Sequence, residues 1–283
     1  MENNKESNEE YKIDYLRFVK KIELNFTDVC NKSCGFCPQS TFYNYTNKMT
    51  IEVLKEIIKN LWKYEFKGIV TIAGRGESTL HPKFDEFIEL LNPPKKPWLL
   101  NLSTNGTTAD KHIETFKKFD RVIWNNYSNE FELKNTKELV KEVRNSGVAV
   151  AFGKVIAESV ETAPKELKLR NRAGSLNEET NGQKYCNNIV KKMFIDTDGT
   201  YRLCCDDWSE RVNVGNIFNE DISEYLNSNK KLDKYRSSLL SGERVLSPCD
   251  KCDHVGEPNI IERYIDKDKR GKLIKFHRSG FKK

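Results

Sequence analysis

One segment of this sequence joins a predicted strand to a group of cysteines: Val19-Lys-Lys-Ile-Glu-Leu-Asn-Phe26, then Asp28-Val-Cys30-Asn-Lys-Ser-Cys34-Gly-Phe-Cys37-Pro38. The alternation of apolar and polar residues predicts a strand that ends just before the first cysteine. The three thiols lie within eight residues, and Gly35 and Pro38 favour a loop that wraps around one metal centre. Structural zinc sites and electron-transfer clusters take four protein ligands. Three cysteines therefore favour a 4Fe–4S cluster with one open iron over a zinc site completed by a distant residue or a buried helical stripe of cysteines.

Strands and helices alternate on the C-terminal side of this segment. The pattern predicts helices at 51–64, 84–91, 109–119 and 136–144 and strands at 68–73, 98–103, 121–124 and 147–156. Such alternation is typical of βαβ units and a parallel sheet. Right-handed crossovers bend such a sheet toward a barrel with its functional groups at the carboxyl ends of the strands. We therefore expect an α/β fold built on a partial (β/α)6-type TIM barrel, with the three cysteines on its functional rim.

Composition narrows the class of protein. The chain has 283 residues, of which 37% are hydrophobic and 32% charged, which suggests one large domain with an appendage. We expect a cytoplasmic protein, because no signal-like start or apolar run of membrane-spanning length is present. In that compartment eight cysteines indicate metal or redox chemistry rather than disulfides. The net charge of +6 matches that of residues 262–283, which we interpret as a solvated basic tail, so nucleic-acid binding is disfavoured.

A second group of cysteines lies in the C-terminal third, at Cys186, Cys204, Cys205, Cys249 and Cys252. A hairpin is expected from 192–195 and 200–204, followed by helices at 222–227 and 231–240. Four of these thiols can complete a closed cluster or a structural zinc site. The fifth, Cys205, is interpreted as a buried thiol, an alternative ligand or a hydrogen donor. The predicted domains are 1–175 for the barrel, 176–257 for the cysteine-bearing extension and 258–283 for the tail.

The CxxxCxxC spacing after the first strand, with an aromatic residue before the last cysteine, resembles the signature of radical SAM enzymes. The resemblance implies that Cys30, Cys34 and Cys37 hold a catalytic 4Fe–4S cluster whose open iron binds S-adenosylmethionine (SAM). Residues 73–77 are similar to the family's Gly-Gly-Glu-Pro turn, although Arg75 separates the glycines and Ser78 replaces the proline. The implied SAM-binding residues are Phe36, Gly74, Gly76, Glu77, Ser103, Asn105 and Asn125.

The second group resembles the Twitch extension, a shortened relative of SPASM, which holds one auxiliary 4Fe–4S cluster. The implied ligands are Cys186, Cys204, Cys249 and Cys252, which gives two clusters in all. Lys154, Arg170 and Arg172 are candidates to bind the substrate or the SAM carboxylate.

These resemblances imply a radical SAM oxidoreductase or epimerase that removes hydrogen from a polar small molecule such as an amino-sugar, a cyclitol or another carbohydrate. Flavodoxin or ferredoxin would supply electrons. Modification of a peptide by epimerisation, crosslinking or maturation is the alternative within the class. A zinc-binding module that contacts nucleic acid is the alternative outside it.

Overall fold

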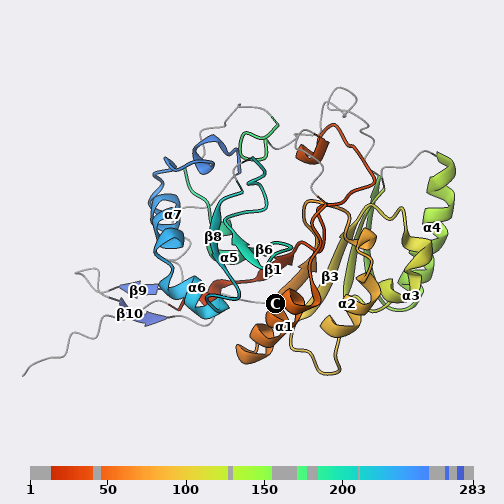
Figure 1. Cartoon of the computed structure of the whole chain (residues 1–283), viewed down its shortest axis with the longest axis horizontal. Helices are drawn as coiled ribbons and strands as arrows, with labels where there is room; N and C mark the ends of the chain where they lie inside the picture. The colour runs from red at the N-terminus through yellow and green to blue at the C-terminus, as the bar shows by residue number, and fades with distance from the viewer. Residues whose placement is uncertain are drawn as a thin grey trace, which may run out of the picture.

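An eight-stranded sheet with the order β5-β4-β3-β2-β1-β6-β7-β8 forms the centre of the protein (Figure 1). The structure is a computed structural model that describes residues 14–40, 46–126, 130–154, 171–176, 184–209, 211–254, 265–267 and 273–276. The strands are β1 (Lys21–Leu24), β2 (Ile69–Ile72), β3 (Leu99–Thr104), β4 (Arg121–Asn126), β5 (Ala149–Lys154), β6 (Lys192–Ile195), β7 (Thr200–Arg202) and β8 (Asn213–Asn216). Neighbours from β5 to β6 are all parallel, which confirms the predicted partial six-stranded barrel.

The crossover helices lie on the outer side of the parallel strands. They are α1 (Ile51–Lys63), α2 (Phe84–Leu91), α3 (Ile113–Phe116) and α4 (Glu130–Asn145). The side chain of Thr50 caps α1 by accepting a hydrogen bond from the Val53 amide, as an N-cap threonine does. The single helix expected over 109–119 is wrong. At His112 the backbone leaves the helical region, and the His112 ring lies 2.8 Å from the Asp85 carboxylate. The segment is therefore divided into a 3-10 turn at Ala109–Lys111 and the short helix α3.

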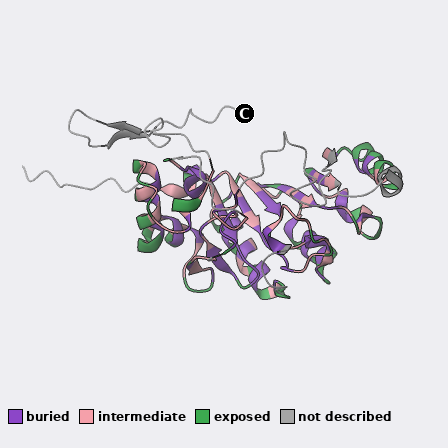
Figure 2. Cartoon of the chain, turned by 90° about the horizontal axis from the view of Figure 1, so that it is seen from above, coloured by how far each residue is buried: buried purple, intermediate pink, exposed green. Residues whose placement is uncertain are grey.

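The core lies between the sheet and these helices, as the buried strands of Figure 2 show. Strand β1 illustrates how the side chains divide. Ile22 and Leu24 are fully buried in the hydrophobic core, whereas Lys21 and Glu23 alternate with them and point to the other face. In a barrel that other face is the lumen, so the polar half of the predicted alternation lies inside the protein.

The predicted hairpin of β6 and β7 is confirmed, and β8 extends it. Strand β6 also pairs in parallel with β1, so one sheet continues from the barrel into the extension. The extension adds α5 (Asn188–Lys191), α6 (Ile222–Ser228) and α7 (Lys230–Ser241). The domain boundary near residue 175 stays a prediction.

Within the basic tail the structure adds a short hairpin, β9 (Ile265–Lys267) and β10 (Leu273–Phe276), that the sequence analysis did not predict. The rest of residues 258–283 lies outside the described part of the chain. In the described part, no helix combines the length and the apolar character required to cross a bilayer.

Candidate functional site

A large open cavity lies at the carboxyl ends of the parallel strands, with an empty volume of about 1200 Å³, including the open space at its mouth. Loops after β1, β2 and β3 contribute its rim, and inward-facing strand residues contribute its floor. All of the predicted catalytic-cluster and SAM residues line it, together with two residues from farther along the chain, Arg172 and Cys205: the predicted residues are Cys30, Cys34, Phe36, Cys37, Gly74, Gly76, Glu77, Ser103, Asn105 and Asn125. The topology thus brings together in one place residues that are up to 175 positions apart in the sequence.

The loop with the three cysteines is held by polar contacts on both sides. The Cys37 amide donates to the Cys34 carbonyl at 2.9 Å, and the Gln39 side chain donates to the Asp28 carbonyl at 2.7 Å. Asn31, between the first two cysteines, donates to Thr107 at 2.7 Å and accepts from Asn105 at 3.0 Å. The cysteine loop is therefore tied to the loop that follows β3.

The glycine turn after β2 packs directly against the backbone that leads into this loop. The Gly76 amide donates to the Thr27 carbonyl at 3.1 Å, and the Glu77 amide donates to the Val29 carbonyl at 2.8 Å. A Cβ atom on Gly76 would lie 2.3 Å from the Val29 oxygen, far inside van der Waals contact. Sequence reasoning assigned this glycine to close approach of a ligand. The structure adds that the chain itself requires it.

Glu77 is 4% exposed, and its carboxylate joins two rim loops. One oxygen accepts hydrogen bonds from the hydroxyls of Thr79 and Thr104, both at 2.8 Å, and the other accepts from the Asn105 amide at 2.7 Å. These donors use most of the lone pairs of the carboxylate, and the second oxygen retains one for a ligand. Glu77 therefore positions the β3 loop as well as lining the cavity.

A buried charge network joins the cysteine loop to the end of β6. Asn25, which follows β1, donates to Asp28 and to Asp196, in both cases at 2.8 Å. Arg211 from the extension lies 2.8 Å from Asp196 and 3.5 Å from Asp28. Burial opposes ionisation of Asp196, but hydrogen bonds from Asn25, Arg211 and Arg202 outweigh it and hold its pKa well below the usual range. The carboxylate is thus a permanent negative charge between barrel and extension.

The surroundings of the three thiols of the cysteine loop favour their protonated form. Burial raises the pKa of Cys30 and of Cys37, and burial together with the two neighbouring cysteines raises that of Cys34 to about 11. Backbone amides at Asn31, Lys32 and Gln39 oppose the shift by donating to sulfur. A cation that binds here must displace protons, and the amides then stabilise the thiolates.

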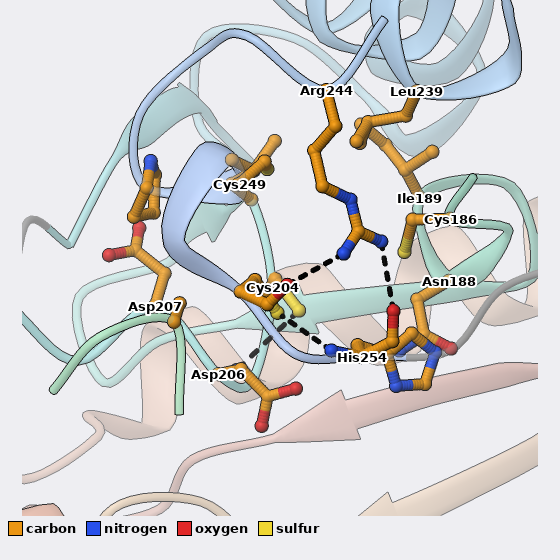
Figure 3. A pocket seen from close by; sticks show the side chains of 14 residues that line it. Cys186, Asn188, Ile189, Cys204, Asp206, Asp207, Leu239, Arg244, Cys249 and His254 are labelled. Carbon is orange, nitrogen blue, oxygen red and sulfur yellow. Dashed lines mark hydrogen bonds between the residues drawn. The ribbon is translucent and has the colours of Figure 1, made fainter. Parts of the chain in front are cut away.

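A second cavity of about 420 Å³ lies in the extension (Figure 3). Cys186, Cys204, Cys249 and Cys252 all line it. Arg244 holds its wall together by donating to the carbonyls of Tyr185, Cys252 and His254 at 2.7–3.0 Å. The His254 and Asp206 amides donate to the sulfurs of Cys252 and Cys204 at 3.4 and 3.5 Å, and such bonds to sulfur are typical of iron–sulfur sites.

The spacing of the sulfur atoms distinguishes between the two kinds of metal centre. A single tetrahedral zinc with Zn–S bonds of about 2.3 Å places its sulfur ligands about 3.8 Å apart. Neither the first cysteine trio nor the second set of four brings three sulfur atoms within 4.8 Å of one another. In this arrangement neither set is positioned to hold a single zinc ion.

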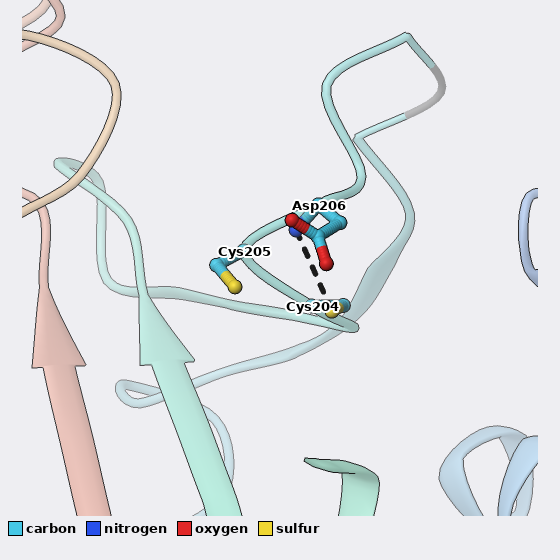
Figure 4. A group of neighbouring side chains, drawn as sticks. All are labelled: Cys204, Cys205 and Asp206. Atoms are coloured by element: carbon cyan, nitrogen blue, oxygen red, sulfur yellow. Dashed lines mark hydrogen bonds between the residues drawn. The ribbon is translucent and has the colours of Figure 1, made fainter. Parts of the chain in front are cut away.

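Cys204 and Cys205 are consecutive residues in the turn after β7 (Figure 4). Cys204 lines the extension cavity and a smaller hollow next to it, and Cys205 lines that hollow and the barrel cavity. A hydrogen bond with Cys205 and burial raise the pKa of Cys204. Cys205, the fifth cysteine of the C-terminal group, therefore forms part of the wall of the barrel cavity.

The remaining predicted site residues differ in their placement. Arg172 lines the barrel cavity, but its guanidinium pairs with the buried Asp206 carboxylate at 2.9 Å. Lys154 lies on β5 opposite Asn126, and the structure describes nothing of its side chain. Arg170 lies outside the described residues.

Sequence analysis missed several charged and aromatic residues of the cavity wall. Lys21 and Glu23 line the lumen from β1, where the polar half of the strand's alternation could have identified them. Arg75, the residue that separates the two glycines, donates to the Asp207 carbonyl at 2.9 Å and lies over the Trp208 ring at 5.1 Å. No short sequence signal identifies Trp208, because its place depends on this contact between barrel and extension.

Two family profiles match the chain. The radical SAM superfamily matches residues 24–128, and SPASM, an iron–sulfur cluster-binding domain, matches residues 186–253. The chain is 24% identical over 257 residues to the S-adenosyl-L-methionine-dependent 2-deoxy-scyllo-inosamine dehydrogenase of Niallia circulans, covering 84% of this chain and 94% of that protein. A probable GTP 3′,8-cyclase of Methanosarcina mazei is 30% identical over 118 residues, which is 40% of this chain and 34% of the relative.

Solved structures share the fold. BtrN in complex with AdoMet and 2-DOIA superimposes with a TM-score of 0.70 at 21% identity, covering 84% of this chain and 94% of that one. SuiB of Streptococcus suis bound to S-adenosylmethionine gives a TM-score of 0.58 at 14% identity, covering 93% and 75%. The two matched domains carry SAM and two 4Fe–4S clusters as cofactors. Residues 24–128 thus form a radical SAM domain, and residues 186–253 form a SPASM/Twitch-type auxiliary-cluster extension.

Proposed function

We propose that this protein is a radical SAM oxidoreductase that oxidises a hydroxyl group of an aminated polyol, such as an amino-sugar or an aminocyclitol. The observation that carries the proposal is the polar barrel cavity, whose wall includes Cys205. Cys205 directly follows Cys204, which lines the cavity of the proposed auxiliary cluster. The relative from Niallia circulans, a dehydrogenase of an inosamine, supports the substrate class because the match spans 94% of its length.

In this proposal Cys30, Cys34 and Cys37 hold the catalytic cluster, and Cys186, Cys204, Cys249 and Cys252 hold the auxiliary one. SAM binds beside Phe36, Gly74, Gly76, Glu77, Ser103, Asn105 and Asn125, all of which line the cavity. When bound, these groups supply reductive cleavage of SAM, a 5′-deoxyadenosyl radical that takes one hydrogen atom from substrate carbon, and an acceptor for the remaining electron.

The residues of this chain orient the reactants and exclude water. Glu77 fixes the β3 loop and offers its free lone pair to the ammonium of the SAM methionine, an interaction that suits a carboxylate. Trp208, 7% exposed, and Arg75 close the barrel against the extension. Exclusion of water there protects a reactive radical from side reactions.

Oxidation is proposed ahead of epimerisation. Oxidation requires the substrate radical to lose an electron toward Cys204 and a hydroxyl proton to solvent or a base, whereas epimerisation requires a hydrogen atom from a thiol. Cys205 supports epimerisation as the second candidate, because its side chain lines the cavity where the substrate would lie.

The partners follow from this chemistry. A one-electron carrier such as flavodoxin or ferredoxin would reduce the catalytic cluster. A peptide substrate stays the alternative within the superfamily, since SuiB shares the fold. The match to the radical SAM superfamily over residues 24–128 replaces the hypothesis of a zinc-binding module that contacts nucleic acid. The cytoplasmic location stays a prediction.

Turnover by the anaerobically reconstituted protein tests the proposal. With dithionite and SAM, an aminocyclitol such as 2-deoxy-scyllo-inosamine should increase 5′-deoxyadenosine formation and give a product two mass units lighter, which is the ketone. A Cys30→Ala, Cys34→Ala, Cys37→Ala variant is the control for the catalytic cluster. Stimulation by a peptide and by none of a panel of amino-sugars and cyclitols would refute the proposed substrate class.

A further inference from the structure

Two opposite charges lie inside the barrel lumen. The Lys21 ammonium contacts the Glu23 carboxylate at 2.7 Å, and their side chains are 29% and 13% exposed. Both residues come from β1 and line the same cavity as the cysteine trio. The pair therefore lies at the floor of the proposed active site.

The fold gains little from this pair. Barrel lumens are normally filled by bulky branched side chains, which pack without loss of hydration. A charge pair that is largely withdrawn from water loses solvation that roughly cancels its attraction, and exposed pairs contribute at most about 1 kcal/mol. Apolar residues at positions 21 and 23 would stabilise the fold at least as well as this charge pair. The presence of charges there therefore suggests that they bind a ligand.

The pair also retains unused hydrogen-bonding capacity. Among the residues that the structure describes, Lys21 is the one partner of the Glu23 carboxylate, through Oε2. The other oxygen, Oε1, can accept further bonds, and the Lys21 ammonium has two N–H groups left. A strong acceptor and a strong donor thus lie next to each other and face the cavity.

The position of Glu23 places this capacity near the reaction. Glu23 lines both the barrel cavity and the smaller hollow that Cys204 and Cys205 share. A ligand bound to it lies between the proposed SAM site and the loop that carries a ligand of the auxiliary centre. Arg172, one of the three cations predicted to bind the substrate or the SAM carboxylate, is already paired with Asp206.

We propose that Lys21 and Glu23 form a subsite for a vicinal amino alcohol, in which Glu23 binds the ammonium group and Lys21 donates to the neighbouring hydroxyl oxygen. The short separation of the two charges suits groups on adjacent carbon atoms. This inference rests on the proposed function and names the part of the substrate that the chain recognises.

The test compares two substrates and two variants. The substrates are 2-deoxy-scyllo-inosamine and the same cyclitol with a hydroxyl in place of the amino group. Glu23→Gln should lower kcat/KM for the amine by about 10- to 100-fold, because it replaces a charge-assisted bond with a neutral one. It should change kcat/KM for the hydroxyl analogue by less than about threefold. The matched control is Glu114→Gln, whose side chain is 77% exposed on α3 and which should change neither value.

Each outcome tests a different part of the proposal. If Glu23→Gln lowers both substrates equally, or leaves the preference for the amine unchanged, the ammonium subsite is wrong while the proposed function stands. If the wild type oxidises neither these two cyclitols nor any other member of the panel of amino-sugars and cyclitols, both the subsite and the proposed function fall. Should Glu23→Gln lose iron or fold poorly, Glu23→Asp keeps the charge and must retain the preference for the amine over the hydroxyl analogue; loss of that preference refutes the subsite.

Discussion

Replacing Gly76 with alanine tests the contact between the glycine turn and the cysteine loop. The new Cβ would lie 2.3 Å from the Val29 oxygen and 2.5 Å from the Thr27 oxygen, whereas real Cβ contacts stay beyond 3.0 Å. The Val29 carbonyl must therefore move by at least 3.0 − 2.3 = 0.7 Å. Val29 precedes Cys30, so the first of the proposed cluster ligands moves with it.

The displacement has two costs of different kinds. Overpacking destabilises a fold by about 1–3 kcal/mol, and strain on the amide bonds to the two carbonyls adds about 1 kcal/mol. We thus expect Gly76→Ala to lose about 2–4 kcal/mol of unfolding free energy. A shift near 1 Å in a reacting group lowers a rate about 100-fold. We expect SAM cleavage to fall by about 10- to 100-fold, or the catalytic cluster to be lost.

Gly147→Ala is the matched control. Gly147 precedes β5, has a φ of +94°, and a Cβ there meets no atom within 4 Å. Alanine at this left-handed φ costs about 1–2 kcal/mol without moving the cysteine loop. Iron content, 5′-deoxyadenosine formation and urea unfolding of each variant separate the two effects. A Gly76→Ala protein with wild-type iron and a wild-type cleavage rate would refute the reasoning, as would an equal loss of activity in Gly147→Ala.

Three further predictions follow from the buried polar groups. The pKa of Asp196 is lowered in the folded protein, so its carboxylate stabilises the fold fully above about pH 4, the pKa of an unfolded aspartate, and this stabilisation is lost as the pH falls below that value. Asp196→Asn should lower the free energy of unfolding by about 3–5 kcal/mol at pH 7. In urea unfolding measured over a series of pH values, the variant should lose less stability toward acid pH than the wild type. Glu77→Gln replaces one acceptor oxygen with a donor that faces the Asn105 amide or the threonine hydroxyls, so urea unfolding should show a loss of about 1–3 kcal/mol and equilibrium dialysis a weaker SAM affinity. Cys204→Ala should lower the iron content from about eight to about four atoms per chain, whereas Cys205→Ala should keep about eight and still form ketone. Loss of iron in Cys205→Ala would make it a ligand. A wild-type product of unchanged mass that Cys205→Ala no longer forms, with both clusters intact, would favour epimerisation.

Local patterns predicted most of the barrel because they depend on neighbouring residues. Helix α2 begins and ends where its apolar spacing and the prolines after it indicate. The strand ends that carry Cys30, Glu77 and Asn105 were likewise predictable, since parallel strands place their carboxyl ends on one rim.

The rest depends on contacts between distant segments. The sequence does not show that β6 completes the parallel set beside β1, because that pairing joins residues about 170 positions apart. The roles of Arg75 and Arg211 depend on the same approach of extension and barrel. The alternation in β1 was visible, but only the curvature of the sheet turns Lys21 and Glu23 toward the cavity.

The pairing of β1 with β6 also has a consequence for how the chain is made. As the polypeptide leaves the ribosome, β1 emerges early and can pair with β2, but its other edge waits until residue 195 has been synthesised. At about 5–20 residues per second, that interval lasts roughly ten seconds or more. Throughout it Asn25 lacks Asp196, so the loop with the first three cysteines lacks this link to β6. Cellular machinery that delivers iron and sulfide has a finished binding site only after translation passes this strand.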